Sequence, residues 1–155
     1  MIGLHPTSVN ADYEKELEIV ARELKSFNKY IAIGEIGMDL YWDKTFLKEQ
    51  QIALDKQINW ALEYDLPVVI HCRDAFDYIY NVLEPYKNTS LKGIFHSFTG
   101  TDDEAARILE FSGFLIGING VVTFKKSHLP EVLTKIPLEK IVLETDSPYL
   151  TPVPN

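Results

Sequence analysis

The sequence has little of several features that mark particular classes of protein. A single cysteine, Cys72, excludes an internal disulfide and a cysteine-based zinc finger. No apolar run approaches the roughly 20 residues that a membrane-spanning helix needs. Residues 1–6 also lack the basic start and the apolar stretch of a signal peptide. We therefore expect a protein without membrane spans that is located in the cytoplasm.

Basic residues are outnumbered by acidic ones. Fifteen Lys and Arg against 23 Asp and Glu give a net charge of -8, which excludes a dominant positive surface that adheres broadly to phosphate backbones. Nucleic acid can still bind at a small site, because bound divalent cations reverse the local sign of a carboxylate-lined cleft. The length suits one domain, which we expect to span residues 1–155.

Short apolar runs alternate with amphipathic stretches along the whole chain, and this alternation predicts strands and helices in turn. Strands are expected at 31–35, 67–71, 93–96, 114–118 and 141–145, with the stub of an earlier strand at 2–4. Helices are expected at 12–28, 46–64, 75–86, 101–111 and 129–135. Asp74 is the expected N-cap of the third helix, and Thr101 or Asp102 that of the fourth.

The predicted strands are continuous apolar runs rather than alternating ones, which is typical of a parallel sheet covered on both faces. The fold class is therefore α/β. A doubly wound sheet and a TIM (β/α)8 barrel both fit this order of elements. Because a complete barrel typically has about 250 residues, a barrel here would be incomplete, with about five to six of the eight strands.

Four side chains that can bind metal follow four different strands. Glu35, His71, His96 and Asp146 each lie at a predicted strand end or one residue beyond it, at the edge where catalytic groups gather in parallel α/β folds. Two imidazoles and two carboxylates suit Zn, Mn or Mg. Each residue alone could equally be a cap or a hydrogen-bonding partner, but four at equivalent ends favour a metal site. Glu35 is long enough to bridge two ions, and Asp146 suits a terminal ligand and general base.

Three further residues are weaker candidates for substrate binding. Arg73 could clamp a phosphate or pair with Asp74 or another carboxylate. Tyr41 and Trp42 could stack on a nucleobase or pack onto the scaffold. For His5, at the end of the predicted stub, we expect a loop role rather than metal ligation.

Six segments together resemble the TatD family of metal-dependent deoxyribonucleases in the amidohydrolase superfamily. They are residues 3–6, 32–39, 66–75, 95–100, 117–120 and 143–150. The resemblance implies a metallo-dependent hydrolase barrel with two metal ions that hydrolyses phosphodiester bonds of DNA. It implies that Glu35 bridges the ions, that His71 and His96 hold one of them, and that Asp146 binds the other and is the general base.

The sequence departs from the family pattern at its start. The family carries a His-x-His pair on its first strand, whereas the histidines here are at 5, 71, 96 and 128. By the same resemblance we expect the chain to lack the family's first two strands at its start and the family's C-terminal helices at its end, so that part of the barrel wall is absent. We then expect one ion at Glu35, His71 and His96 but no tightly bound second ion. Exposed strand edges should favour self-association or complementation by another segment.

Two alternatives to the nuclease remain open on the sequence. The same site could open a cyclic amide or cleave an ester, as other barrel metallohydrolases do. Without the His-x-His ligands, the chain could instead be a catalytically inactive fragment or binding module.

Overall fold

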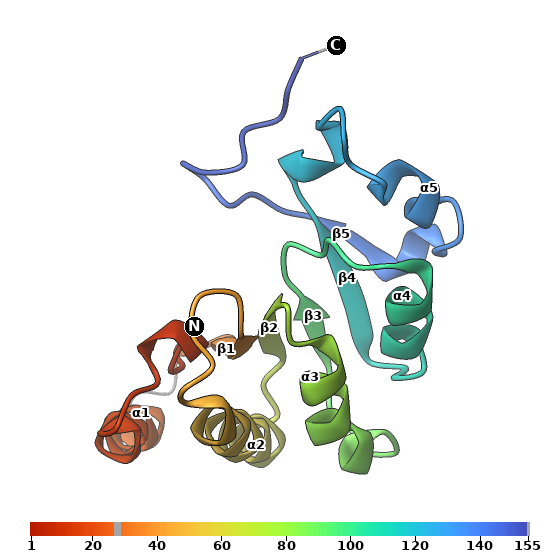
Figure 1. The fold of residues 1–155 in the computed structure, drawn as a ribbon. Helices are drawn as coiled ribbons and strands as arrows, with labels where there is room; N and C mark the ends of the chain where they lie inside the picture. The colour runs from red at the N-terminus through yellow and green to blue at the C-terminus, as the bar shows by residue number, and fades with distance from the viewer. Residues whose placement is uncertain (27–28, 155) are drawn as a thin grey trace.

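Five parallel strands form one sheet whose order in space follows their order in the chain, β1-β2-β3-β4-β5 (Figure 1). The computed structural model describes residues 1–26 and 29–154. The strands are β1 (Ile33–Asp39), β2 (Val68–Arg73), β3 (Gly93–Phe95), β4 (Phe114–Ile118) and β5 (Ile141–Leu143). The α-helices are α1 (Tyr13–Ser26), α2 (Leu47–Glu63), α3 (Phe76–Leu83), α4 (Asp102–Leu109) and α5 (Leu129–Leu133). Short 3-10 turns are η1 (Pro6–Ser8), η2 (Glu84–Tyr86), η3 (Gly120–Thr123) and η4 (Leu138–Lys140).

The sequential strand order distinguishes between the two predicted architectures. Right-handed crossovers that always step to the next strand place every connecting helix on the same face of the sheet. Helices α2, α3 and α4 do lie along one face, and the segment after β5 passes on the other side (Figure 1). A doubly wound sheet would instead reverse its strand order at a switch point. The sheet is thus a barrel wall, which confirms the predicted incomplete barrel.

β1 extends further than its predicted end at residue 35. Ile36 and Met38 are fully buried, so the apolar pattern continues to Asp39. The register with β2 shifts between Gly34 and Ile36, which makes Glu35 the extra residue of a bulge. The predicted stub at 2–4 contributes a single parallel bridge, from Ile2 to Ile33. Residues 27 and 28 of the first predicted helix lie outside the described residues.

The helix starts show one correct and one wrong prediction. Thr101 is the N-cap of α4, and its side chain and that of Glu104 form a capping box. Asp74 is not the N-cap of α3, because Ala75 holds that position and Asp74 has a positive φ of 52°. The predicted helix at 75–86 is divided into α3 and the turn η2.

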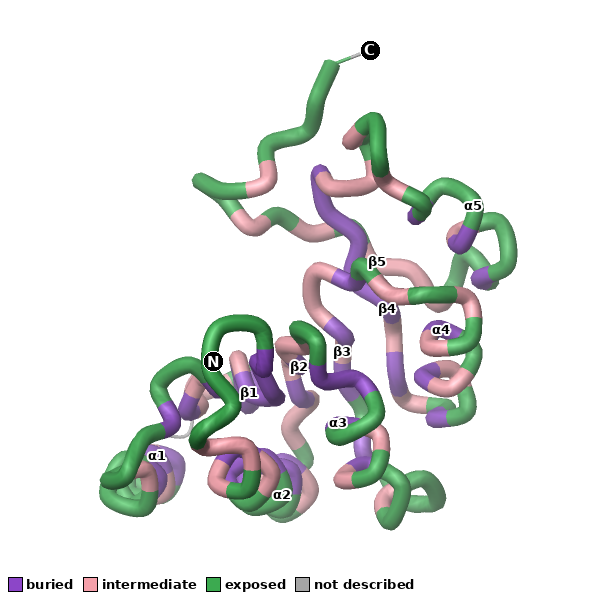
Figure 2. The backbone as a smooth tube through the Cα atoms, viewed as in Figure 1, coloured by how far each residue is buried: buried purple, intermediate pink, exposed green. Residues whose placement is uncertain are grey.

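The core lies between the sheet and its helices (Figure 2). Leu54 and Ile58 of α2 are fully buried against strand residues such as Ile36 and Ile70. Two glutamines of the same helix, Gln50 and Gln57, are buried as well. Of the helices in the described part of the chain, none is long and apolar enough to span a membrane.

Candidate metal centre

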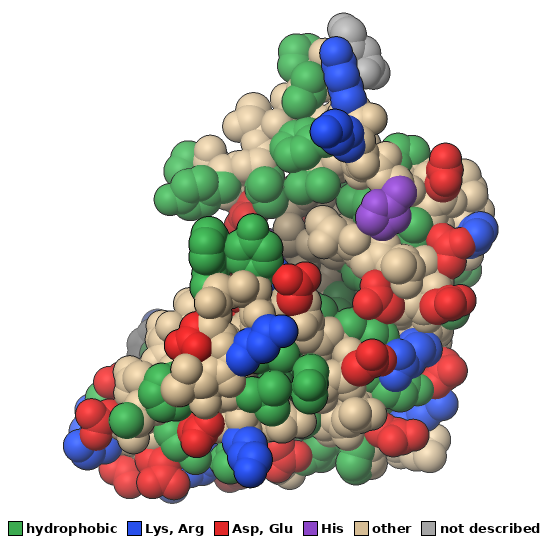
Figure 3. Space-filling model, in the orientation of Figure 1, with side chains coloured by type: hydrophobic (Ala, Val, Ile, Leu, Met, Phe, Trp, Pro, Cys, Tyr) green, Lys and Arg blue, Asp and Glu red, His purple; other side chains and the backbone are tan. Residues whose placement is uncertain are grey.

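All four predicted metal ligands line one cleft of about 490 Å³. Its lining also includes His5, Arg73, Tyr149 and Leu150, so the cleft lies between the strand ends and the C-terminal segment. The space-filling view shows the surface hollowed below this segment, and charges of both signs are scattered over the visible face (Figure 3). The side chains therefore share one rim of the sheet.

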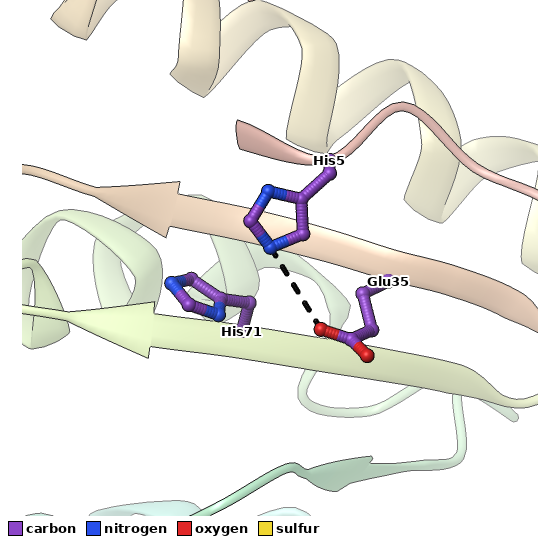
Figure 4. A group of neighbouring side chains, drawn as sticks. All are labelled: His5, Glu35 and His71. Carbon is purple, nitrogen blue, oxygen red and sulfur yellow. Dashed lines mark ion pairs between the residues drawn. The ribbon is translucent and has the colours of Figure 1, made fainter. Parts of the chain in front are cut away.

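Two of the predicted ligands, Glu35 and His71, form a compact group with His5. One ligand atom each from His5, Glu35 and His71 lies within 4.8 Å of the others (Figure 4). His5 Nε2 is 3.7 Å from Glu35 Oε2, and the rings of His5 and His71 meet edge to face with centroids 4.6 Å apart. His5 precedes η1, Glu35 stands at the bulge of β1, and His71 lies in β2. Three separate segments thus converge on one point.

The spacing of this group fits a divalent ion. Nitrogen and oxygen ligands lie about 2.0–2.2 Å from zinc, so two ligands of one ion are about 3–4.4 Å apart. The 3.7 Å between His5 and Glu35 falls in this range. Two imidazoles with one carboxylate are also a donor set that catalytic zinc uses. The residues present therefore fit a metal ion.

His5 was missed by the sequence reasoning, which gave it a loop role. Its Nδ1 does accept a hydrogen bond from the backbone N–H of Thr7 at 3.2 Å, at the start of η1. Its Nε2, however, faces Glu35. The four predicted ligands were chosen because each stands at the end of a predicted strand. Residues 2–4 were counted only as a stub, although the backbone of Ile2 pairs with β1. Counted as a full strand, they would have placed His5 at a strand end as well.

His96 and Asp146 form a second pair in the cleft. His96 Nε2 is 3.5 Å from Asp146 Oδ1, a spacing that also suits two ligands of one ion. His96 follows β3 and Asp146 lies three residues beyond β5. The structure thus places His5 with Glu35 and His71, and pairs His96 with Asp146.

Burial and neighbouring groups shift the pKa values of His5 and His96 in opposite directions. Burial, and next the charge of His71, lower the pKa of His5, which keeps its ring in the neutral form that binds metal. A hydrogen bond to Glu144 raises the pKa of His96, so a proton there competes with a cation. Burial raises the pKa of Cys72 to about 12, which leaves that neighbour of His71 an uncharged thiol.

Two buried glutamines of α2 hold the backbone that carries the site. Gln57 accepts a hydrogen bond from the N–H of Leu4 at 2.6 Å and donates to its carbonyl at 3.3 Å, directly before His5. Gln50 makes the same pair of contacts with Asp39, at 2.9 and 3.2 Å. The two glutamines are seven residues apart and therefore share one face of the helix. One helix thus fixes the residue before His5 and the last residue of β1.

The three candidate substrate residues also lie together. The guanidinium of Arg73 is 3.8 Å from the ring centroid of Tyr41 and 5.8 Å from that of Trp42. Tyr41 and Trp42 are exposed residues, at 50% and 78%. Within the described residues Arg73 forms no ion pair, so the predicted alternative of pairing with Asp74 is not seen. We call Arg73, Tyr41 and Trp42 the rim residues; of the three, Arg73 lines the cleft.

Known proteins share both this sequence and this fold. The "Uncharacterized metal-dependent hydrolase YabD" of Bacillus subtilis is 37% identical, across 99% of this chain and 60% of its own length. The crystal structure of YJJV, a TatD homologue from Escherichia coli K12, matches with a TM-score of 0.84 and 33% identity, over 98% of this chain and 59% of its own. A TatD family hydrolase from Entamoeba histolytica matches with a TM-score of 0.74 and 31% identity, over 97% and 50%.

The chain spans less than two thirds of the length of each of these proteins. The similarity nevertheless extends along the whole of this chain. The family model described as TatD related DNase matches residues 1–155. This chain belongs to the TatD family.

Proposed function

We propose that this chain carries the metal-binding wall of a hydrolase that cleaves phosphodiester bonds of DNA. The observation that supports it most is the convergence of His5, Glu35, His71, His96 and Asp146 on one cleft. A relative named as a metal-dependent hydrolase and a family described as DNases point in the same direction. Among the predicted ions, zinc and manganese suit this mixed nitrogen and oxygen set better than magnesium.

A divalent ion supplies Lewis acidity and makes water a better nucleophile at neutral pH. The protein contributes the positions of the groups around it. Glu35 lies 3.7 Å from His5. Besides the hydrogen bond to Glu144, the charge of Glu35 is among the causes that raise the pKa of His96, so Glu35 is the candidate bridge. Asp146 is part exposed, with 38% of its side chain accessible, and can accept a proton from an incoming water as the general base.

The rim residues suit a nucleic-acid strand. A planar guanidinium at Arg73 can bind a phosphate through two parallel hydrogen bonds. Tyr41 and Trp42 are exposed residues whose rings can stack on bases, which tolerates any base sequence. This small cationic and aromatic rim reconciles DNA binding with a net charge of -8.

The test is cleavage of single-stranded DNA by the chelator-treated chain with zinc, manganese or magnesium added back. We expect cleavage only with metal, and its loss in the His71→Ala variant. The matched control is His128→Ala, because His128 is exposed and bonds the carbonyl of Gly100 outside the cleft. Metal-independent cleavage, or cleavage that survives in His71→Ala, would overturn the proposal. Cleavage of an ester or amide but not of DNA would leave the metal centre and change the substrate.

We further infer that the open edge of β5 pairs with another strand. Within the described residues β5 pairs with β4 alone, and Leu143 is 83% exposed. Exposed strand edges are templates for pairing. Light scattering should therefore show association of the isolated chain, and a stable monomer at high concentration would contradict this. A cytoplasmic location remains part of the proposal.

A further inference from the structure

Each of the two histidines from the central strands makes a hydrogen bond to a carboxylate that faces it from another strand. His71 Nε2 is 2.9 Å from Asp39 Oδ2, and His96 Nδ1 is 2.7 Å from Glu144 Oε2. We propose that Asp39 and Glu144 are positioning residues that fix the ring orientation and the tautomer of these two histidines. The inference rests on the proposed metal site, in which both rings are ligands.

Hydrogen bonds fix the orientation of the Asp39 carboxylate. It is the last residue of β1 and only 6% exposed. Its backbone N–H and carbonyl are both bonded to Gln50. Its Oδ1 accepts from the N–H of Tyr41 at 3.1 Å, which leaves Oδ2 for His71. Because its backbone and its Oδ1 are both held, the Asp39 carboxylate sets the rotation of the His71 ring.

Glu144 reaches His96 across an intervening strand. It follows β5, His96 follows β3, and β4 lies between them. The carboxylate passes over Gly117 of β4, where an added Cβ would lie 2.5 Å from Glu144 Oε1. The other contact of that oxygen is the backbone N–H of Ser97, which donates to it. A glycine near the C-terminal end of β4 thus provides the space through which the carboxylate reaches the imidazole.

The two contacts predict opposite tautomers. An ionised carboxylate accepts only, so the ring nitrogen that faces it must carry the proton. His71 is then protonated at Nε2, which leaves its Nδ1 as the metal-binding atom. His96 is protonated at Nδ1, which leaves its Nε2, the atom 3.5 Å from Asp146. The bond made by one ring nitrogen decides which nitrogen remains for the metal.

The first measurement needs neither a metal nor a variant. Long-range 15N–1H correlation spectra of the metal-free chain, recorded at a pH where the rings are neutral, identify the protonated nitrogen of each histidine. We expect Nε2–H for His71 and Nδ1–H for His96. The reverse tautomer at both rings, or an unresolved mixture at both, overturns the inference.

The second measurement uses Asp39→Asn and Glu144→Gln, which keep the size of each side chain and remove its charge. Each variant should shift the tautomer of its own histidine and leave that of the other unchanged. Calorimetric zinc affinity should fall about 10- to 100-fold in each, as is usual when the partner of a metal-bound histidine is lost. The matched controls are Asp43→Asn and Glu139→Gln, both exposed carboxylates outside the cleft lining.

The outcomes separate this inference from the proposed function. Normal zinc binding in both variants, with unchanged tautomers, overturns the positioning roles while the metal site stands. No zinc binding by the parent chain overturns the metal site, and the tautomers of the metal-free chain still decide whether the carboxylates set the rings. Equal losses in the controls would also count against Asp39 and Glu144. If a variant fails to fold, the spectra of the parent chain remain decisive.

Discussion

The two sides of the sheet hold their parts of the cleft in different ways. On the β1–β2 side, two strands of seven and six residues pair over their whole length. Helix α2 covers this side and fixes the backbone at Leu4 and Asp39 through its two buried glutamines. On the β3–β5 side, β3 and β5 have three residues each, and Asp146 lies in a segment beyond the last strand. The metal group of His5, Glu35 and His71 belongs to the first side.

This difference indicates a division of labour. Buried strands with satisfied backbone groups give the fixed geometry that metal ligands need. Short strands and exposed segments are less restrained and have lower local stability. We therefore expect the group on the β1–β2 side to contribute more to metal affinity than Asp146 does. Asp146, on the β3–β5 side, is better placed for a role in proton transfer.

The largest contrast should appear in stability. Ile70 of β2 is fully buried, and Ile70→Ala should lower the free energy of unfolding by about 2–5 kcal/mol. Leu143 of β5 is 83% exposed, and Leu143→Ala should change it by no more than about 0.5 kcal/mol. Urea unfolding followed by circular dichroism measures both. Equal losses would show that the two sides are equally important for the fold.

The next contrast concerns metal affinity. His71→Ala removes a member of the compact group, and should weaken zinc binding on the order of 100-fold or more, because loss of an outer partner alone costs about 10–100-fold. Asp146→Asn should weaken it less than His71→Ala does, because Asp146 lies outside that group. Calorimetric titration with zinc measures both constants. A larger loss in Asp146→Asn than in His71→Ala would reverse the proposed division.

Much of the fold could be predicted from the sequence, for a physical reason. Strands of a parallel sheet appear as continuous apolar runs, so all five were located, and residues 114–118 match β4 at both ends. Strand ends in a parallel sheet share one edge, so Glu35, His71, His96 and Asp146 could be grouped without coordinates. That they line one cleft agrees with that argument. Their roles as ligands stay predictions.

What the sequence could not reveal depends on contacts between distant segments. β1 continues past Glu35 because a bulge places the carboxylate while the apolar pattern goes on. His5 joins the site because Gln57, 53 positions away from Leu4, holds the chain there. The reach of Glu144 depends on the missing side chain of Gly117 in another strand. No local pattern reports such a contact.

A third prediction concerns the attachment of the His5 segment. Gln57→Leu leaves the N–H and carbonyl of Leu4 without their partner, and a buried unsatisfied group costs about 1–3 kcal/mol. We expect a loss of stability in that range and weaker zinc binding, because His5 is next in the chain. The matched control is Gln51→Leu on the same helix, where the side chain is part exposed. If Gln57→Leu lowers stability but leaves zinc affinity unchanged, His5 is not a ligand.

The smallest expected effect concerns Arg73, where a substitution should change DNA binding more than it changes stability. Arg73→Lys keeps the charge but loses the planar contact with Tyr41, so stability should fall by no more than about 1 kcal/mol. Arg107 offers a matched control, because its guanidinium lies 3.9 Å from the ring centroid of Tyr80, outside the lining of the cleft. Arg107→Lys should cost similar stability. Fluorescence anisotropy with single-stranded DNA should show weaker binding for Arg73→Lys than for Arg107→Lys, since both guanidinium groups are stacked but Arg73 lines the cleft and Arg107 does not. Equal DNA binding by the two variants would make the Arg73 contact purely structural and would leave the rim without a role in substrate binding.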